Sequence, residues 1–302
     1  MTSALSLFSR PTPIEPAPRL AESIGLAPDR LLIKRDDLIG LGGGGNKVRK
    51  LEVTIAAALA SGADTVVTTG APQSNHARLT AAAAARTGLR SVLVLEGEAP
   101  ARRLGNLLLD ELFGAEVVFA GERGAAAVAE EEARSRNAYL IPFGGTSAAS
   151  AVAYRRAGEE LLEQVPDIGT VVVAVGSGGT MAGLVAALGA ERVLGVSTGA
   201  VADARATVAG LLSEMGEPAE ALRIDDARIG RGYEHLTPEV RHAMTTAART
   251  EGLVVDPTYT GRAMAGLIAA AAAGDLPAGR VVLLHTGGLP GLFGHPDLQQ
   301  DG

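Results

Sequence analysis

The sequence predicts an α/β protein of two domains, each a mainly parallel twisted sheet flanked by helices. Short β-branched runs alternate with alanine-rich runs of helical character, as in 64–70 followed by 75–88. The strand runs are apolar on both faces, which is typical of a parallel sheet covered by helices. The helix over 75–88 should end at Gly88, because glycine readily adopts the left-handed conformation of a helix cap.

The same cycle continues along the chain. In its first half, further strands are expected within 90–97, 115–120 and 138–145, each followed by a helix. A second series of strands is expected within 170–179, 192–199, 221–226, 252–256 and 280–288. The run 30–37 suits this second sheet better than the first. These elements give a smaller domain at 45–160 and a larger domain from 1–44 and 161–302, with a ligand expected in a cleft at the carboxyl ends of strands.

Composition excludes several classes of function. The formal net charge of -7 argues against nucleic acid as the main partner. The absence of cysteine removes disulfides, thiolate metal sites and a cysteine nucleophile, and it fits a cytoplasmic protein. No apolar run reaches the roughly 18 residues that a membrane helix needs, and the N-terminus lacks the apolar core of a signal peptide. The five histidines are scattered, so no metal site is predicted.

The first candidate site motif is a run of four glycines before Lys47. Glycines leave room for a flat ligand close to the backbone. Lys47 should lie at or near a helix N-terminus, where the helix dipole disfavours its charged form. A neutral lysine can form an imine with an aldehyde. The alternative is a solvated lysine after a flexible loop, and this motif alone does not separate the two.

The second motif, 70–79, follows a strand and opens a helix. Gln73, Ser74 and Asn75 are suited to capping the helix and to binding a carboxylate or phosphate there. One serine or asparagine is enough for a cap. Four polar residues in a row, His76 included, favour ligand binding.

The third motif is a loop between a strand and a helix that suits a phosphate group, because backbone N–H groups and hydroxyls converge there. Its residues are Gly176, Ser177, Gly178, Gly179 and Thr180. Gly176, Gly178 and Gly183 also fall near the dinucleotide-binding pattern, so an NAD(P)-dependent oxidoreductase is an alternative. The next strand lacks the acidic residue which that pattern requires at its end. A single phosphate monoester therefore fits best.

The fourth motif is a group of late tyrosines and threonines at strand ends. Tyr233 lies in a glycine-bracketed loop, and Tyr259 and Thr260 precede a helix. Thr286 follows a buried strand. A phenol at such a place can donate a proton or stack on a ring, whereas core packing is the alternative for Tyr259.

An imine-forming lysine, a phosphate loop, a carboxylate loop and phenolic acids together indicate pyridoxal 5′-phosphate as cofactor. The sequence resembles the D-cysteine desulfhydrase and 1-aminocyclopropane-1-carboxylate deaminase group of pyridoxal-phosphate enzymes, which is related to tryptophan synthase β. The motifs "GGNKVRKLE", "QSNHAR", "GSGGT", "GRGY", "DPTYTGRAM" and "HTGG" occur in the order of that family. The resemblance covers nearly the whole chain.

The resemblance implies a role for each matching residue. Lys47 would carry the cofactor, Asn75 would bond its ring hydroxyl, and Ser74 would lie beside the substrate carboxylate. Tyr233 and Tyr259 would be the active-site tyrosines. The remaining residues implied are the phosphate loop Gly176 to Thr180 and Thr286 for the cofactor, and Gln73 and Thr260 for a small amino-acid substrate. A homodimer is also implied.

Two positions separate the branches of that family. The deaminase branch carries glutamate and leucine where this chain has Thr260 and Thr286, and the desulfhydrase branch prefers hydroxyl residues. A neutral threonine against the ring nitrogen weakens the electron sink, which still suffices for β-elimination of a good leaving group. Met181 departs from the histidine or glutamine of many relatives. L-Cysteate sulfo-lyase, the deaminase, and a cofactor-binding carrier without catalysis remain alternatives.

Overall fold

The computed structural model describes residues 5–298. Contacts divide the described chain into two compact units. Unit 1 contains residues 5–9, 39–150 and 290–298, and unit 2 contains residues 10–38 and 151–289. The sequence-based division gave 45–160 to the smaller domain. In the structure the central segment of unit 1 is 39–150, and both terminal segments belong with it.

Unit 1 contains a parallel four-stranded sheet in the order β5-β4-β3-β6. Its strands are β3 (Thr65–Gly70), β4 (Arg90–Leu95), β5 (Glu116–Phe119) and β6 (Tyr139–Leu140). Each lies within a run that the sequence predicts as a strand. The pairing of β3 with β4 runs in register from Thr65 opposite Arg90 to Gly70 opposite Leu95.

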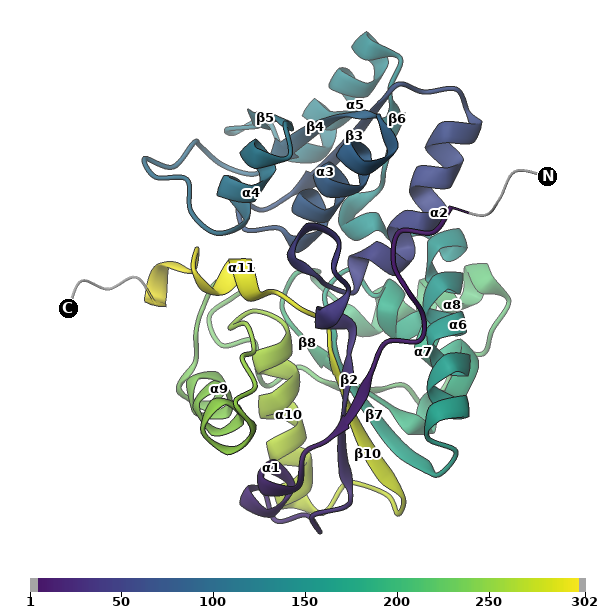
Figure 1. Cartoon of the computed structure of the whole chain (residues 1–302), viewed down its shortest axis with the longest axis vertical. Helices are drawn as coiled ribbons and strands as arrows, with labels where there is room; N and C mark the ends of the chain where they lie inside the picture. The colour runs from purple at the N-terminus through teal and green to yellow at the C-terminus, as the bar shows by residue number, and fades with distance from the viewer. Residues whose placement is uncertain (1–4, 299–302) are drawn as a thin grey trace. The chain divides into compact units, whose positions relative to one another are not determined.

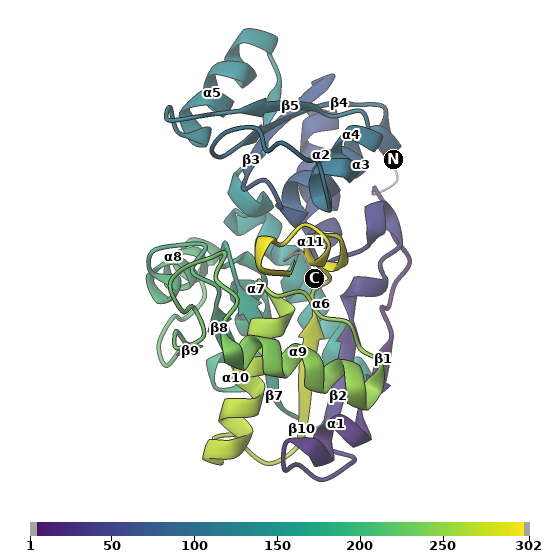
Figure 2. The same cartoon turned by 90° about the vertical axis from the view of Figure 1, so that its left-hand side faces the viewer.

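Helices cover both faces of this sheet, as the two-faced apolar pattern predicts (Figure 2). They are α2 (Lys47–Ala60), α3 (Asn75–Thr87), α4 (Asn106–Leu112) and α5 (Ala125–Arg136). Successive residues of a strand point to opposite faces. Val66 therefore packs with residues of α2 and α3, and Val67 packs with residues of α5. Helix α3 ends at Gly88, which has a φ of 78° and caps it as predicted.

Unit 2 contains a six-stranded sheet in the order β1-β2-β10-β7-β8-β9. Its strands are β1 (Ile14–Pro16), β2 (Leu31–Arg35), β7 (Ile168–Val175), β8 (Val193–Ser197), β9 (Arg223–Asp225) and β10 (Arg280–His285). Only the pairing of β1 with β2 is antiparallel among these strands. The early strand β2 pairs with β10, so its predicted place in the second sheet is confirmed.

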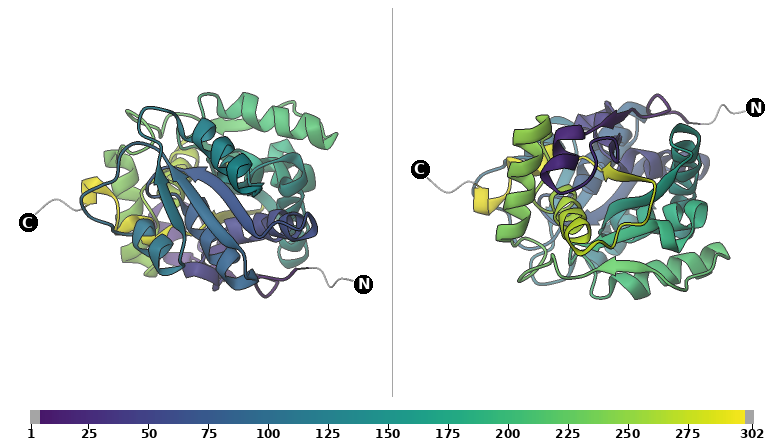
Figure 3. Two further views of the ribbon diagram at one scale, coloured as in Figure 1. Left: turned by 90° about the horizontal axis from the view of Figure 1, so that it is seen from above. Right: turned by 90° about the horizontal axis from the view of Figure 1, so that it is seen from below.

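The helices of unit 2 form a group on each side of the sheet (Figures 1 and 3). One group is α1 (Pro18–Ser23), α9 (Pro238–Glu251) and α10 (Thr260–Ala273). The other is α6 (Ala148–Gln164), α7 (Gly179–Leu188) and α8 (Ala204–Met215), whose apolar residues share one core with β7 and β8. The short helix α11 (Leu289–Leu292) follows β10. Among residues 5–298, no helix is long and apolar enough to cross a membrane.

The strand expected within 252–256 is wrong. The segment between α9 and α10 is irregular and is not part of the sheet. Strand β10 already has β2 and β7 as neighbours, so it offers no free edge to this segment. The backbone groups find other partners: Leu253 N donates to Ala247 O of α9, and Val254 O bonds to the His285 ring.

Gly183 serves helix packing. A Cβ atom added there would lie 2.3 Å from Ala151 O and 2.5 Å from Tyr154 Cβ, both on α6. The glycine that completes the near-match to a dinucleotide pattern is therefore required where α7 crosses α6. Helix packing therefore explains Gly183 without a nucleotide ligand.

We expect Gly183→Ala to lower the free energy of unfolding by about 1–3 kcal/mol, because the backbone of α6 has to move away. Gly210→Ala on α8 is the matched control, because a Cβ there meets nothing within 4 Å. The control should gain about 0.4–1 kcal/mol from the restricted unfolded chain. Urea denaturation of both variants measures the difference, and equal midpoints would contradict the packing role.

Candidate functional site

The glycine loop of unit 1 leads directly into α2, whose first residue is Lys47. The glycines at positions 42 to 45 all have positive φ, at 56°, 83°, 81° and 133°. A Cβ at Gly42 would lie 2.6 Å from Ala82 Cβ of α3. At this position the glycine is therefore needed for close approach to α3. Asn46 occupies the N-cap of α2, but its side chain makes no capping bond.

Arg78 holds this loop in place from α3. Its Nη1 donates to Gly42 O and its Nη2 donates to Gly44 O at 3.0 Å. The side chain is fully buried, and burial lowers the pKa of Arg78 to about 10. Sequence reasoning missed this residue. The available signal was a single arginine among the small residues of a helix that the pattern buries.

The pKa of Lys47 is lowered, as the motif predicts, and burial is the cause. Burial lowers its pKa to about 8, and a hydrogen bond with Lys50 works in the opposite direction. Lys50 Nζ also donates to Gly144 O and to Thr146 Oγ1, each at 2.6 Å. Burial and the neighbouring Lys47 hold the pKa of Lys50 well below its ordinary value. A neutral Lys50 amine has two N–H groups for these acceptors and a lone pair for Lys47.

Lysine is scarce in this chain. The sequence has only three, at positions 34, 47 and 50. Lys34 is committed to structure, because its buried Nζ bonds to Glu160 Oε1 at 2.5 Å and to Gln164 Oε1 at 2.6 Å. Lys50 is buried by the contacts described above. Lys47 is the one lysine that keeps partial exposure. Its lowered pKa favours the imine-forming role over that of a solvated surface lysine.

The polar run at the start of α3 divides between structural and potential binding roles. Ser74 is the N-cap, and its Oγ accepts from Ala77 N at 3.1 Å. The amide of Gln73 bonds at both ends to the backbone, with Leu104 O and Asn106 N. A substrate role for Gln73 consequently depends on its backbone N–H.

Asn75 is oriented by a residue that sequence reasoning missed. Asn106 Nδ2 donates to Asn75 Oδ1 at 3.2 Å and to Gln73 O at 2.9 Å. With its oxygen engaged in this way, Asn75 presents its Nδ2 group as a hydrogen-bond donor. A donor is what an ionised ring hydroxyl of the cofactor needs.

His76 faces the interior of unit 1. It is buried, and its Nε2 lies 2.8 Å from Thr68 Oγ1. Burial and the neighbouring Lys47 and Lys50 hold the pKa of His76 well below its ordinary value, so the ring is neutral. Its ring also fills the space that a Cβ at Gly145 would need, at 2.9 Å. His76 therefore packs in the core.

In unit 2, the predicted phosphate loop joins β7 to α7. Gly178 has a φ of 82°, and no side chain caps the helix that follows it. A Cβ at Gly178 would meet Thr207 and Leu211 of α8 at 3.1 and 3.2 Å, so the loop is backed by α8. Ser177 and Thr180 bring buried hydroxyl groups to the same turn. Uncapped N–H groups and hydroxyls at a helix start fit a phosphate.

Tyr233 and Tyr259 form a hydrogen-bonded pair with 2.6 Å between their hydroxyl oxygens. Their rings meet edge to face, with centroids 5.9 Å apart. Burial and Tyr259 raise the pKa of Tyr233 well above its ordinary value. Only one of the two phenol protons can lie in the hydrogen bond between the hydroxyls. The other proton is left over, so the neutral pair can act as a proton donor. A Cβ at Gly176 would come within 3.0 Å of the Tyr259 ring, which places this ring against the phosphate loop.

Asp256 organises the start of α10. Its carboxylate accepts from the backbone N–H groups of Thr258, Tyr259 and Thr260 at 3.0, 2.8 and 2.8 Å. Burial raises its pKa, and these bonds act against the increase. Thr260 Oγ1 then lies 3.2 Å from Thr286 Oγ1, which joins the two predicted threonines at the end of β10.

Met181 belongs to the core of unit 2. It is fully buried, and its Sδ lies 2.3 Å from where a Cβ of Gly195 on β8 would be. The methionine that departs from the family pattern therefore fills space over a glycine in the sheet.

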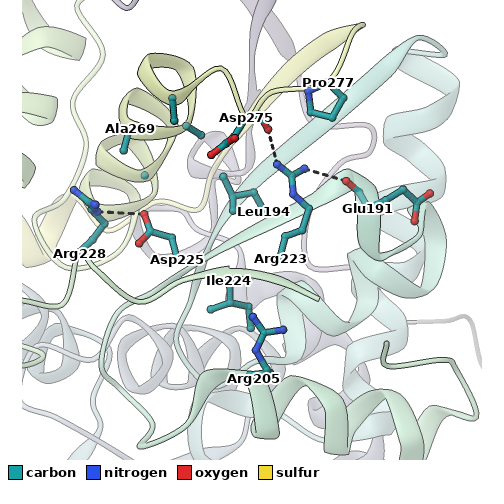
Figure 4. Close-up of a pocket in the computed structure, with 13 residues that line it drawn as sticks. Glu191, Leu194, Arg205, Arg223, Ile224, Asp225, Arg228, Ala269, Asp275 and Pro277 are labelled. Atoms are coloured by element: carbon teal, nitrogen blue, oxygen red, sulfur yellow. Dashed lines mark hydrogen bonds and ion pairs between the residues drawn. The ribbon is translucent and has the colours of Figure 1, made fainter. Parts of the chain in front are cut away.

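A separate groove of about 800 Å³ lies at the β9 edge of unit 2 (Figure 4). It is lined by arginines and by the small residues of α10, and by none of the predicted site residues. The arginines are bonded to its wall: Arg223 donates to Glu191 O and Asp275 O, and Arg228 pairs with Asp225. No group of three or more potential metal ligands occurs among residues 5–298.

Parallel α/β units with a low-pKa lysine at one helix start and an uncapped glycine loop at another are the architecture of a cofactor-dependent enzyme. The chain belongs to the pyridoxal-phosphate dependent enzyme family, whose profile matches residues 5–287. Its cofactor is pyridoxal 5′-phosphate. The low pKa of Lys47 suits an amine that condenses with an aldehyde, and the uncapped loop at 176–180 suits a phosphate.

Several relatives match nearly the full chain. A D-cysteine desulfhydrase of Klebsiella pneumoniae is 40% identical over 323 residues, which cover 97% of each chain. A protein of Pyrococcus abyssi named "Putative 1-aminocyclopropane-1-carboxylate deaminase" is 40% identical over 312 residues, covering 96% of this chain and 92% of the relative. The crystal structure of an ACC deaminase homologue superposes with a TM-score of 0.86 at 36% identity, covering 97% and 94%.

The pKa of Lys47 predicts how its reactivity depends on pH. In cofactor-free protein, the rate of borohydride-trapped attachment of pyridoxal phosphate should increase as pH rises through about 8 and then level off, as the neutral amine becomes dominant. Peptide mass spectrometry of the Lys47 peptide after trapping measures this rate.

Lys50→Met is the control for this titration. The Lys50 hydrogen bond raises the pKa of Lys47, so its removal should move the midpoint to lower pH. A rate that still climbs towards the ordinary lysine value of 10.5 would contradict the assignment.

Proposed function

We propose that the protein is a pyridoxal-phosphate dependent β-elimination lyase that converts D-cysteine and water to pyruvate, sulfide and ammonia. The observation that carries the choice of substrate is the pair of hydroxyls at Thr260 and Thr286, 3.2 Å apart. The family resemblance associates hydroxyl residues at these positions with the desulfhydrase branch. The D-cysteine desulfhydrase relative supports the same choice.

In this proposal, the cofactor is held by the residues that the sequence motifs predict for it. Lys47 binds it covalently, Asn75 donates to its ring oxygen, and Thr286 faces its ring nitrogen as a neutral partner. The residues of the 176–180 loop bind its phosphate. When bound, the cofactor supplies the electron sink that stabilises negative charge at the α-carbon of an amino acid.

The substrate is positioned by the start of α3. Its carboxylate binds the Ser74 hydroxyl, Asn75 and the backbone N–H of Gln73. Ser74 can donate to this carboxylate while its oxygen caps the helix, because a hydroxyl both donates and accepts. Thr260 contacts the substrate from unit 2.

Two proton transfers complete the reaction. The substrate amine first displaces Lys47 Nζ. The freed Nζ then removes the proton from the α-carbon, and a pKa of about 8 leaves an appreciable neutral fraction at physiological pH. The Cβ–S bond breaks, and the phenol pair of Tyr259 and Tyr233 protonates the departing sulfur. The released 2-aminoacrylate reacts with water to give pyruvate and ammonia. The raised pKa of Tyr233 keeps its proton in place until the sulfur carries charge.

A second candidate is a 1-aminocyclopropane-1-carboxylate deaminase, favoured by the ACC deaminase homologue with a TM-score of 0.86. The same lysine and tyrosines would serve that reaction, with ring opening in place of sulfide release. L-Cysteate, with sulfite as leaving group, is a further alternative. We also propose a cytoplasmic homodimer, in keeping with the family resemblance and the absence of cysteine.

Lys47→Ala should abolish pyruvate formation from D-cysteine and the visible absorption of the lysine-linked cofactor, because no other lysine retains exposure. Peptide mapping of the borohydride-reduced wild type should locate the cofactor on Lys47. Retention of both activity and absorption by the variant would overturn the assignment.

The substrate is tested with a panel of D-cysteine, L-cysteate, β-chloro-D-alanine, D-serine and 1-aminocyclopropane-1-carboxylate. The highest kcat/KM for pyruvate formation is expected with D-cysteine. Release of 2-oxobutyrate from the last compound would instead establish the deaminase and reverse the interpretation of Thr260 and Thr286. A cofactor-loaded protein that turns over none of the five would be a carrier without catalysis.

A further inference from the structure

We propose that Arg262 is a positioning residue for the tyrosine pair, which fixes the segment that carries Tyr233 and so keeps the two phenols in contact. This inference rests on the proposed function for its effect on rate. Arg262 lies on α10, two residues after Thr260. It lies within the motif "DPTYTGRAM", but the proposed reaction gives it no role.

The guanidinium of Arg262 is surrounded by backbone carbonyls. Its Nη2 lies 2.9 Å from Gly232 O, 2.8 Å from Tyr233 O and 3.0 Å from His235 O. Its Nη1 donates to Thr198 O at the end of β8. One side chain therefore joins three parts of unit 2: α10, the end of β8 and the segment from Gly232 to His235.

This segment is irregular, and its other hydrogen bonds include those from Gly232 N to Ile229 O and from His235 N to Gly232 O. Residues 230–235 form no helix or strand. Gly230 and Gly232 have φ angles of 66° and 150°, which glycine adopts freely. Within the segment, Arg231 N donates to the ring of His235. The hydrogen bonds to Arg262 join this irregular segment to helix α10.

The position of Arg262 is energetically demanding. The residue is fully buried, and burial lowers its pKa. Its hydrogen-bond partners among the described residues are carbonyls, with no carboxylate among them. A buried cation without a directly bonded anion destabilises a fold unless its donors are well satisfied. Lysine could not replace it fully, because three donors on one nitrogen do not span four acceptors as the planar guanidinium does.

Helix α10 thereby positions both phenols. Tyr259 is its N-cap residue, and the Tyr259 N–H is fixed by Asp256 at 2.8 Å. Tyr233 lies 26 residues earlier in the chain and is fixed through Arg262. The 2.6 Å bond between the hydroxyls requires both anchors. Loss of Arg262 should release Tyr233 and leave Tyr259 without its partner.

The consequence for the reaction is specific. A displaced pair would donate its proton to the departing sulfur less effectively, while the carboxylate site at α3 would be unchanged. We expect Arg262→Gln to lower kcat for pyruvate formation by about 10- to 100-fold. KM should change much less than kcat. Arg262→Lys should recover part of the loss.

A double-mutant cycle tests the coupling. Arg262→Gln is measured in the wild type and in Tyr233→Phe, with the holoenzyme in each case. If Arg262 acts through Tyr233, the double variant should have the kcat of Tyr233→Phe alone, because the hydroxyl that Arg262 positions is already gone. Multiplication of the two losses, or an unchanged kcat in Arg262→Gln, would overturn the proposal.

Near-ultraviolet circular dichroism gives a readout that does not depend on turnover. The chain has four tyrosines and no tryptophan, so its aromatic signal comes mainly from tyrosine. Arg262→Gln should change this signal in the wild type but produce little further change in Tyr233→Phe. If D-cysteine is not a substrate, the proposed function fails while this cycle still decides the positioning role. Should Arg262→Gln not fold, Arg262→Lys takes its place in the same cycle.

Arg205→Gln is a control at an exposed arginine of unit 2. Arg205 also donates to a backbone carbonyl of unit 2, Leu222 O at 2.6 Å, but it lines the groove at β9 and not the tyrosine segment (Figure 4). Its replacement should leave kcat and the aromatic signal as in the wild type. If kcat falls equally in the control and in Arg262→Gln, the loss reflects general destabilisation, and the proposal is overturned.

Discussion

Hydrogen bonds from buried charged side chains to the backbone hold the loops of the candidate site. Arg78 binds the carbonyls of the glycine loop, and Arg262 binds those of the tyrosine segment. Asp256 performs the complementary task by accepting from N–H groups at the start of α10. Loops rich in glycine cannot maintain a conformation by steric restriction, and only 3% of the residues are aromatic. Polar anchors inside each unit take over that function, because a buried loop must satisfy its backbone groups in any case.

The repeating strand–helix pattern was sufficient to predict most of the fold, because hydrophobic periodicity and glycine caps are local signals. The strands of both sheets follow it except β1, which was not predicted, and α3 ends at its predicted cap. The failure at 252–256 has a non-local cause, since β10, to which this segment bonds through His285, is already paired with β2 and β7. The association of residues 290–298 with unit 1 is equally invisible in local sequence.

The chemistry of the site could be predicted in part. Lys47 was identifiable because a lysine after consecutive glycines at a helix start is a local pattern. The pairing of Tyr233 with Tyr259 could not be foreseen from residues 26 positions apart. Asn106 lies in no quoted motif, and the motifs that contain Arg78 and Arg262 do not show what these side chains bind. Glycines were the most ambiguous signal. Gly183 serves the crossing of two helices and Gly42 the approach to α3, whereas Gly176 makes room for a tyrosine ring.

The scarcity of lysine has a consequence beyond this reaction. Only three of the 27 lysines and arginines are lysines, and two of these three are buried among structural partners. Arginine supplies nearly all the positive charge, and a guanidinium does not condense with simple aldehydes under mild conditions as an amine does. The protein therefore offers a reactive aldehyde few amines other than Lys47 with which to form an imine. Amine-directed cross-linkers and glycating sugars should find the folded protein a poor target for the same reason.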